Sequence, residues 1–169
     1  WCDSRAVETG ARGVDALGAD LCLARLLNLP GNFTAAKLAW VREHEPQAFA
    51  RVARILLPGD WLAFRMTGRA ATTASGLSEG ILWDFAAHAP SPDVLAWAGL
   101  RPDQLGDLVP TFGPQGTLTA AAAAELGLLA GTPVCYRAGD QPNNAFSLGA
   151  IHPGDVAATA GTSGVVYAV

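Results

Sequence analysis

The chain has 169 residues, which is enough for one large domain or for a substantial part of a longer protein. Half of the residues are hydrophobic and 15% are charged, so the composition excludes a disordered chain and predicts a folded core. The net charge of −4 and the lack of a basic run argue against a nucleic-acid partner, and no apolar run reaches the roughly 18 residues of a membrane helix.

Helices are expected in quick succession near the start of the chain. Leucines near helical spacing predict the first helix over Val14–Leu27, and Pro30 with the following glycine ends it. Thr34 is expected to cap the second helix. Pro46 suits the first turn of a third helix, which we expect to reach Ala53.

The next stretch combines helices with a polar segment. Asp60 is expected to cap a helix over Trp61–Met66, which Gly68 closes. The hydroxyl side chains of Thr72–Ser78 predict a polar loop exposed to water. Two further helices are expected, one opened by Ser91-Pro92 and running to Trp97 and a short one from Pro102 to Leu105.

From Gly116 onward strands and helices alternate, which is the pattern of a layered α/β sheet. The first of these elements is a helix capped by Thr119 and ended by Gly127. The other predicted elements are a strand over Val134–Tyr136, a helix over Asn144–Leu148 and strands over Val156–Thr159 and Val165–Val169. We therefore look for chemistry in this part of the chain.

Three widely spaced cysteines, Cys2, Cys22 and Cys135, have no CxxC pair and no neighbouring histidine. They predict reduced thiols in a cytoplasmic protein and no metal site. The chain begins at Trp1 rather than Met and stops inside a predicted strand at Val169, so we expect a fragment of a longer protein.

Asp140 is the first candidate for a chemical role. It follows a predicted strand and Gly139, and ligands of α/β proteins bind where strands end. A carboxylate at such a place can accept the proton of a substrate hydroxyl that attacks a phosphoryl group. Aspartate is also a preferred helix N-cap, and the residues alone leave both interpretations open.

The segment Gly161–Gly164 is the second candidate. Its glycines permit close approach of the backbone, and its amides and hydroxyls can bind phosphate oxygens. The same composition also suits a hairpin turn. No lysine follows as in a P-loop, and the absence of a residue between Ser163 and Gly164 excludes the G-x-S-x-G nucleophile motif.

Taken together, the segments 138–145 and 160–166 resemble the FGGY family of carbohydrate kinases, and most closely its xylulokinases. The first reads Ala-Gly-Asp-Gln-Pro-Asn-Asn-Ala and the second Ala-Gly-Thr-Ser-Gly-Val-Val. Segments 1–5, 32–40, 56–62, 65–68 and 131–134 resemble the same family in the same order. The resemblance spans nearly the whole chain.

The resemblance implies an actin-like ATPase fold of two ribonuclease-H-like domains with sugar and ATP meeting between them. The chain would then hold the later part of the first domain and the start of the second. We expect residues 1–152 to belong to the sugar-binding domain and residues 153–169 to begin the nucleotide-binding domain.

The same resemblance implies the site residues and the reaction. Asp140 matches the catalytic base, and Asn32, Asp140 and Gln141 are the expected substrate-binding residues. Gly161, Thr162, Ser163 and Gly164 match the loop that meets the ATP phosphates. The implied enzyme transfers a phosphoryl group from ATP, with Mg²⁺, to a ketose. D-xylulose is the first choice of acceptor. The expected partners are these small molecules and a second copy of the chain in a homodimer.

The chain departs from the family pattern at two places. It has Arg137-Ala138-Gly139 where the family commonly has two or three glycines, and the stretch Thr72–Ser78 lacks a carboxylate and an aromatic residue that are typical there. A sibling kinase for glycerol, ribulose or fuculose is one alternative. A non-catalytic actin-like sugar-binding protein is the other.

Overall fold

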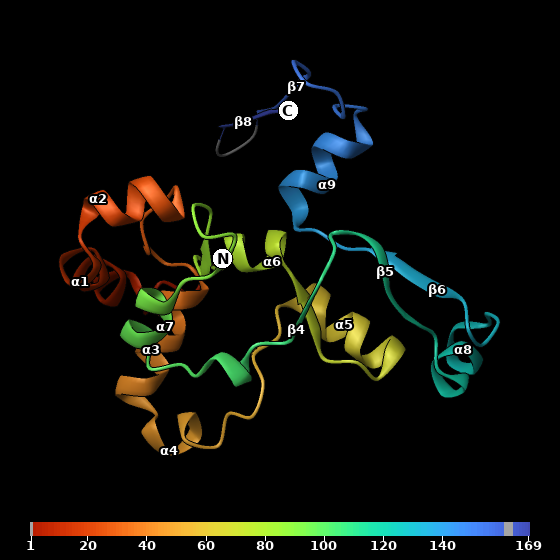
Figure 1. The fold of residues 1–169 in the computed structure, drawn as a ribbon, viewed down its shortest axis with the longest axis horizontal. Helices are drawn as coiled ribbons and strands as arrows, with labels where there is room; N and C mark the ends of the chain where they lie inside the picture. Colours follow the sequence, from red (N-terminus) through yellow and green to blue (C-terminus); the bar gives the residue numbers. More distant parts are fainter. Residues whose placement is uncertain (1, 161–163) are drawn as a thin grey trace. The chain divides into compact units, whose positions relative to one another are not determined.

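The computed structural model describes residues 2–160 and 164–169 (Figure 1). They form two compact units, of which the first extends to Arg137 and the second begins at Ala138. Each unit is described by itself below. A domain boundary after residue 152 stays a prediction.

The first unit consists mainly of helices with short strands between them. Its helices are α1 (Val7–Leu17), α2 (Ala19–Leu21), the π-helix η1 (Cys22–Leu26), α3 (Thr34–His44), α4 (Pro46–Phe49), α5 (Pro58–Thr67), α6 (Ala74–Glu79), α7 (Pro92–Ala98), the 3₁₀-helix η2 (Pro102–Gln104) and α8 (Ala120–Leu126). Its strands are β1 (Ala71–Thr73), β2 (Trp83–Asp84), β3 (Ala89–Pro90), β4 (Asp107–Val109), β5 (Phe112–Thr117) and β6 (Pro133–Tyr136). The pair β1–β4 is parallel, whereas β2–β3 and β5–β6 are antiparallel.

Helix ends set by short-range chemistry agree with the sequence prediction. Ser91 accepts a hydrogen bond from the Val94 amide at the start of α7, and Thr119 does the same for the Ala122 amide at the start of α8. Gly127 ends α8 with a φ of 67°, which glycine adopts without a steric penalty. These caps are therefore confirmed.

The first and second helices differ from the prediction. The single helix expected over Val14–Leu27 is interrupted at Gly18, whose φ of 84° is not helical, and it continues as α2 and η1. Thr34 does not cap α3, because it is already the first helical residue and Phe33 stands at the N-cap. The helix opened by Pro46 ends at Phe49 rather than at Ala53.

The stretch Thr72–Ser78 is also different from the exposed loop that its polarity predicted. Thr72 and Thr73 are only 2% and 1% exposed, and Thr73 caps α6 by accepting the Gly76 amide. Asp60 is likewise no N-cap: it is the third residue of α5 and accepts the Leu57 amide from within the helix. The Thr73 hydroxyl bonds to the backbone and is therefore compatible with burial, so polarity alone predicted the wrong environment.

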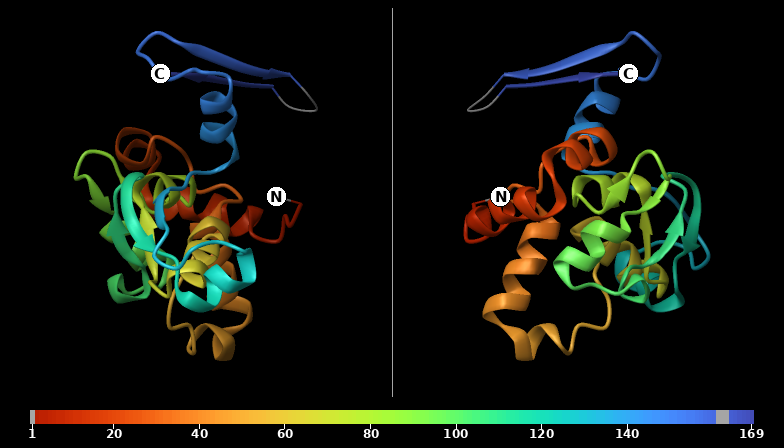
Figure 2. Two further views of the ribbon diagram at one scale, coloured as in Figure 1. Left: turned by 90° about the vertical axis from the view of Figure 1, so that its right-hand side faces the viewer. Right: turned by 60° about the vertical axis from the view of Figure 1, so that its left-hand side comes forward.

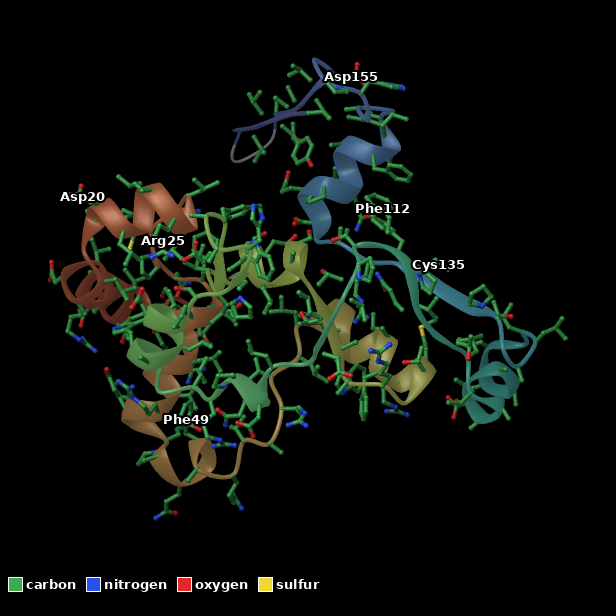
Figure 3. The ribbon with its side chains drawn as sticks, viewed as in Figure 1. Asp20, Arg25, Phe49, Phe112, Cys135 and Asp155 are labelled. Atoms are coloured by element: carbon green, nitrogen blue, oxygen red, sulfur yellow. The ribbon has the colours of Figure 1, made fainter. Side chains whose placement is uncertain are left out.

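Helices α1, α3 and α7 pack side by side (Figures 1 and 2). The main core lies among η1, α3, α6, β2 and α7. Its buried apolar residues are Cys22, Leu26, Ala35, Ala39, Leu77, Ile81, Leu82, Trp83, Val94, Leu95, Ala98, Leu100 and Leu105. The alanines of α3 allow its neighbours to approach closely. Phe112, labelled in Figure 3, lies on the antiparallel pair β5–β6. Its ring stacks on that of Tyr136 at a centroid distance of 4.8 Å.

Asp84 joins β2 to η1 through a buried carboxylate. Its Oδ1 accepts hydrogen bonds from the Ala86 and Ala87 amides at 2.9 Å, and its Oδ2 lies 2.7 Å from Nη2 of Arg25 (Figure 3). These bonds favour the ionised form and therefore lower the pKa of Asp84. The Ala87 amide has the largest effect, and the Arg25 guanidinium acts in the same direction.

Replacing Asp84 by Asn in the complete protein is expected to lower the melting temperature at neutral pH. Because the folded pKa lies below the unfolded value of 3.8, the carboxylate stabilises the fold above pH 3.8, and this contribution is lost as the pH falls through the lowered folded pKa. The difference in melting temperature between Asp84→Asn and the parent should therefore shrink in acid. Asp103→Asn is the control. The Asp103 carboxylate pairs with Arg101 but is 65% exposed, so its replacement should change the melting temperature little. A pH-independent effect of Asp84→Asn would contradict the assignment.

The second unit contains α9 (Asp140–Ser147) and the antiparallel strands β7 (Val156–Ala160) and β8 (Gly164–Ala168). The turn before β7 is held by Asp155, which accepts the amides of Ile151 and His152 (Figure 3). None of the helices in residues 2–160 and 164–169 has both the length and the apolar composition to cross a membrane.

Candidate functional site

Asp140 is the first residue of α9 and its side chain is exposed. Gly139 occupies the N-cap with an extended backbone, so Asp140 does not cap the helix as one interpretation of the sequence had it. Oδ1 of Asp140 accepts the Gln141 amide at 3.0 Å, and Nε2 of Gln141 lies 3.4 Å from Oδ2. The structure thus brings two predicted site residues together, with the glutamine orienting the carboxylate.

The residues around Asp140 keep the start of α9 in place. The side-chain amide of Asn143 donates to the carbonyl oxygen of Ala138 at 2.9 Å, which ties the preceding loop to the helix. Pro142 is tolerated here because the first four backbone N–H groups of a helix have no partner within it. A carboxylate in this first turn is also favoured by the positive end of the helix dipole.

The predicted phosphate-binding segment connects β7 to β8. Residues 161–163 lie outside the described residues, and Gly164 begins β8 opposite Ala160. Binding of ATP phosphates by Gly161–Gly164 stays a prediction.

Asn32 belongs to the first unit, in the loop before α3. Its Nδ2 donates to the carbonyl oxygen of Asp3 at 2.6 Å, so the amide holds the N-terminal segment against this loop. Its Oδ1 is buried and has no hydrogen-bond partner among the described residues. Asn32 thus contacts the N-terminal segment in the structure. Its role in substrate binding stays a prediction.

A buried polar cluster lies at the end of β6, and sequence reasoning missed it. Arg137 is 9% exposed at its side chain, and its Nη1 donates to Oδ1 of Asp60 at 3.1 Å and to the carbonyl oxygen of Ala71 at 3.0 Å. Its Nε donates to Oε1 of Gln115 at 3.0 Å. The departure from the family's glycines at Arg137 was the only available signal.

Burial dominates the electrostatics of this cluster. Asp60 is 3% exposed, and its removal from water raises its pKa although the Arg137 guanidinium beside it acts in the opposite direction. Without Arg137 the carboxylate would face a still larger penalty for ionisation. Arg137 is therefore one of several groups, with the Leu57 amide, that favour the ionised form of Asp60 inside the fold.

The first 147 residues match the family model "FGGY family of carbohydrate kinases, N-terminal domain". The chain belongs to the FGGY family of carbohydrate kinases. This FGGY chain is 34% identical to a xylulose kinase of Streptomyces rubiginosus over 171 aligned residues, which cover 100% of the chain and 35% of that relative. It is also 34% identical to an autoinducer-2 kinase of Yersinia enterocolitica, over 75% of the chain and 24% of that relative.

The likeness extends to solved structures of the family. The crystal structure of xylulose kinase from Rhodospirillum rubrum superposes with a TM-score of 0.89 at 30% identity, covering 97% of the FGGY chain and 34% of that structure. The α/β fold is therefore that of the corresponding part of the actin-like ATPase sugar kinases, as the resemblance predicted. The chain spans about a third of the length of these relatives.

Proposed function

We propose that the complete protein is an ATP-dependent sugar kinase whose acceptor is a ketose, with D-xylulose as the first choice. The observation that carries this proposal is the identity of about one third to a xylulose kinase across the whole chain. A fold alone does not specify a reaction, because one fold hosts many functions. A carboxylate held at the start of α9 supplies the chemical group that the reaction needs.

In the proposed reaction Asp140 accepts the proton of the sugar hydroxyl. The hydroxyl oxygen attacks the γ-phosphorus of ATP, the new O–P bond forms as the bond to the bridging oxygen of ADP breaks, and D-xylulose 5-phosphate and ADP leave. Phosphoryl transfer depends mainly on positioning and on neutralising charge. Gln141 contributes by orienting the carboxylate of Asp140.

ATP is assigned to the segment Gly161–Gly164, whose backbone amides would meet its phosphates. Magnesium bound to a nucleotide keeps several water and phosphate ligands and needs one or two carboxylates at most. Among residues 2–160 and 164–169, no three His, Cys, Asp or Glu side chains form a cluster that could hold a metal ion. The ion supplies charge neutralisation at the phosphates when bound.

A sibling kinase is the second candidate function. The identity of 34% to an autoinducer-2 kinase over three quarters of the chain favours it, because a kinase named for another acceptor reaches the same identity as the xylulose kinase does. The altered stretch Thr72–Ser78 also allows a different acceptor.

A panel of acceptors tests both candidates. ADP release by the complete protein is measured in a coupled assay with D-xylulose, D-ribulose, L-fuculose, glycerol and the autoinducer-2 precursor. We expect kcat/KM to be highest with D-xylulose, and a higher value with another acceptor would assign the sibling function. Sugar binding by calorimetry without ADP release from any acceptor would contradict a kinase and favour a non-catalytic sugar-binding protein.

A further inference from the structure

Arg137 is the last residue of the first compact unit, and its guanidinium is held by three different segments. Asp60 comes from α5, Ala71 from β1 and Gln115 from β5. A guanidinium is planar and its donors point in fixed directions, unlike the ammonium group of lysine. Three bonds in these directions fix the end of β6 relative to α5, β1 and β5.

Stability alone does not account for this arrangement. Taking two charges out of water is costly, and well-packed apolar residues of similar volume often replace a buried ion pair without loss of stability. The remaining amino group of Arg137, Nη2, is buried and has no hydrogen-bond partner among the described residues, which adds a further cost. We therefore look for the benefit of Arg137 in the geometry that it fixes at the end of β6.

The chain reaches Asp140 soon after Arg137. Two residues, Ala138 and Gly139, separate them, so the chain can place their Cα atoms no more than about 11 Å apart. On the far side, the bond from Asn143 to the Ala138 carbonyl oxygen fastens this short connection to α9. The chain is thus anchored on each side of the Arg137–Ala138 peptide.

We propose that Arg137 is a positioning residue of the kinase. Its hydrogen bonds fix the backbone at the end of β6, from which the chain continues to Asp140. The proposal rests on the proposed function, because it requires Asp140 to be the base. Arg137 itself does not touch the reacting atoms and acts through Asp140. A displacement of about 1 Å at a reacting group can lower a rate about a hundredfold.

The test uses the complete protein with both charges removed, as Asp60→Asn/Arg137→Met, so that no unpaired carboxylate is left buried. We expect kcat to fall about ten- to hundredfold while KM for sugar and for ATP changes less than about threefold. The matched control is Asp103→Asn/Arg101→Met, which removes an exposed ion pair in the same way and should leave kcat unchanged. Arg137→Lys keeps a cation but lacks the planar fork, and it should also lose turnover; it serves as the test if the double variant does not fold.

A double-mutant cycle with Asp140→Asn separates positioning from a general structural effect. If Arg137 acts through Asp140, its replacement costs little further activity once Asp140 is Asn. Additive losses, or unchanged kcat in the folded pair variant, would overturn the positioning role and leave the proposed function intact. Normal turnover of Asp140→Asn alone would reject Asp140 as the base, and the positioning role with it, whereas the proposed kinase function fails only if no acceptor releases ADP.

Discussion

Replacing Asp140 by Asn in the complete protein is expected to lower kcat by about two to four orders of magnitude, the usual contribution of a general base. Asn keeps the size of the side chain and can still accept the Gln141 amide, so the local structure should persist. It cannot take the proton of the sugar hydroxyl. The melting temperature and the KM for sugar should therefore stay close to those of the parent.

The matched control is Asp93→Asn. Asp93 is an exposed aspartate in the first turn of α7, as Asp140 is in the first turn of α9, and we assign it no role in the reaction. Steady-state kinetics of both variants, with the coupled ADP assay, check the prediction. Turnover of Asp140→Asn within about threefold of the parent, against the roughly hundredfold minimum expected of a base, would reject Asp140 as the base.

Gln141→Ala disturbs the Asp140 carboxylate less than Asp140→Asn does, and its turnover is measured in the same assay. The shorter of its two bonds to Asp140 comes from the backbone amide and survives the substitution, whereas the side-chain bond at 3.4 Å is lost. The expected loss of turnover is therefore much smaller than for Asp140→Asn.

Short-range chemistry accounts for the parts of the fold that the sequence predicted well. Ser91 and Thr119 cap their helices because a hydroxyl oxygen reaches an amide three residues further along, whatever the rest of the chain does. Gly127 ends α8 because the left-handed conformation there suits a residue without a Cβ. Such interactions are contained in a few neighbouring residues.

Burial depends on distant segments, and there the sequence prediction was wrong. Thr72 and Thr73 lie in β1, which pairs with β4 more than 30 residues later, and no local pattern indicated this parallel pair. The break at Gly18 has a similar cause, because a row of leucines with helical spacing does not show where the chain turns. Hydrophobic periodicity therefore located the helices better than it located their ends.

The candidate site was predicted as separate residues rather than as a set of contacts. Asp140 was proposed from its motif and stays a prediction as a site residue, and the structure adds its hydrogen bonds with Gln141. The cluster of Asp60, Gln115 and Arg137 escaped prediction because its members are separated by up to 77 residues. Bonds of this kind follow from tertiary structure, and a single sequence does not reveal them.

Gly10→Ala is expected to destabilise the complete protein by at least about 3 kcal/mol, at the upper end of the usual cost of overpacking. Gly10 lies on the buried side of α1, against the turn that contains Gly31. A Cβ at Gly10 would lie 1.7 Å from the carbonyl oxygen of Gly31 and 2.6 Å from its carbonyl carbon. These are backbone atoms, so no side-chain rotation relieves the overlap, and α1 or the turn must move.

Gly59→Ala is the matched control, since Gly59 also lies in a helix but a Cβ there would have no atom within 4 Å. Alanine should stabilise α5 slightly, by about 0.5–1 kcal/mol, because glycine loses more backbone freedom on folding. Thermal unfolding followed by circular dichroism compares the two variants with the parent. Equal melting temperatures for Gly10→Ala and Gly59→Ala would show that α1 does not pack on the Gly31 turn as closely as described, since only a close backbone contact makes the two glycines differ.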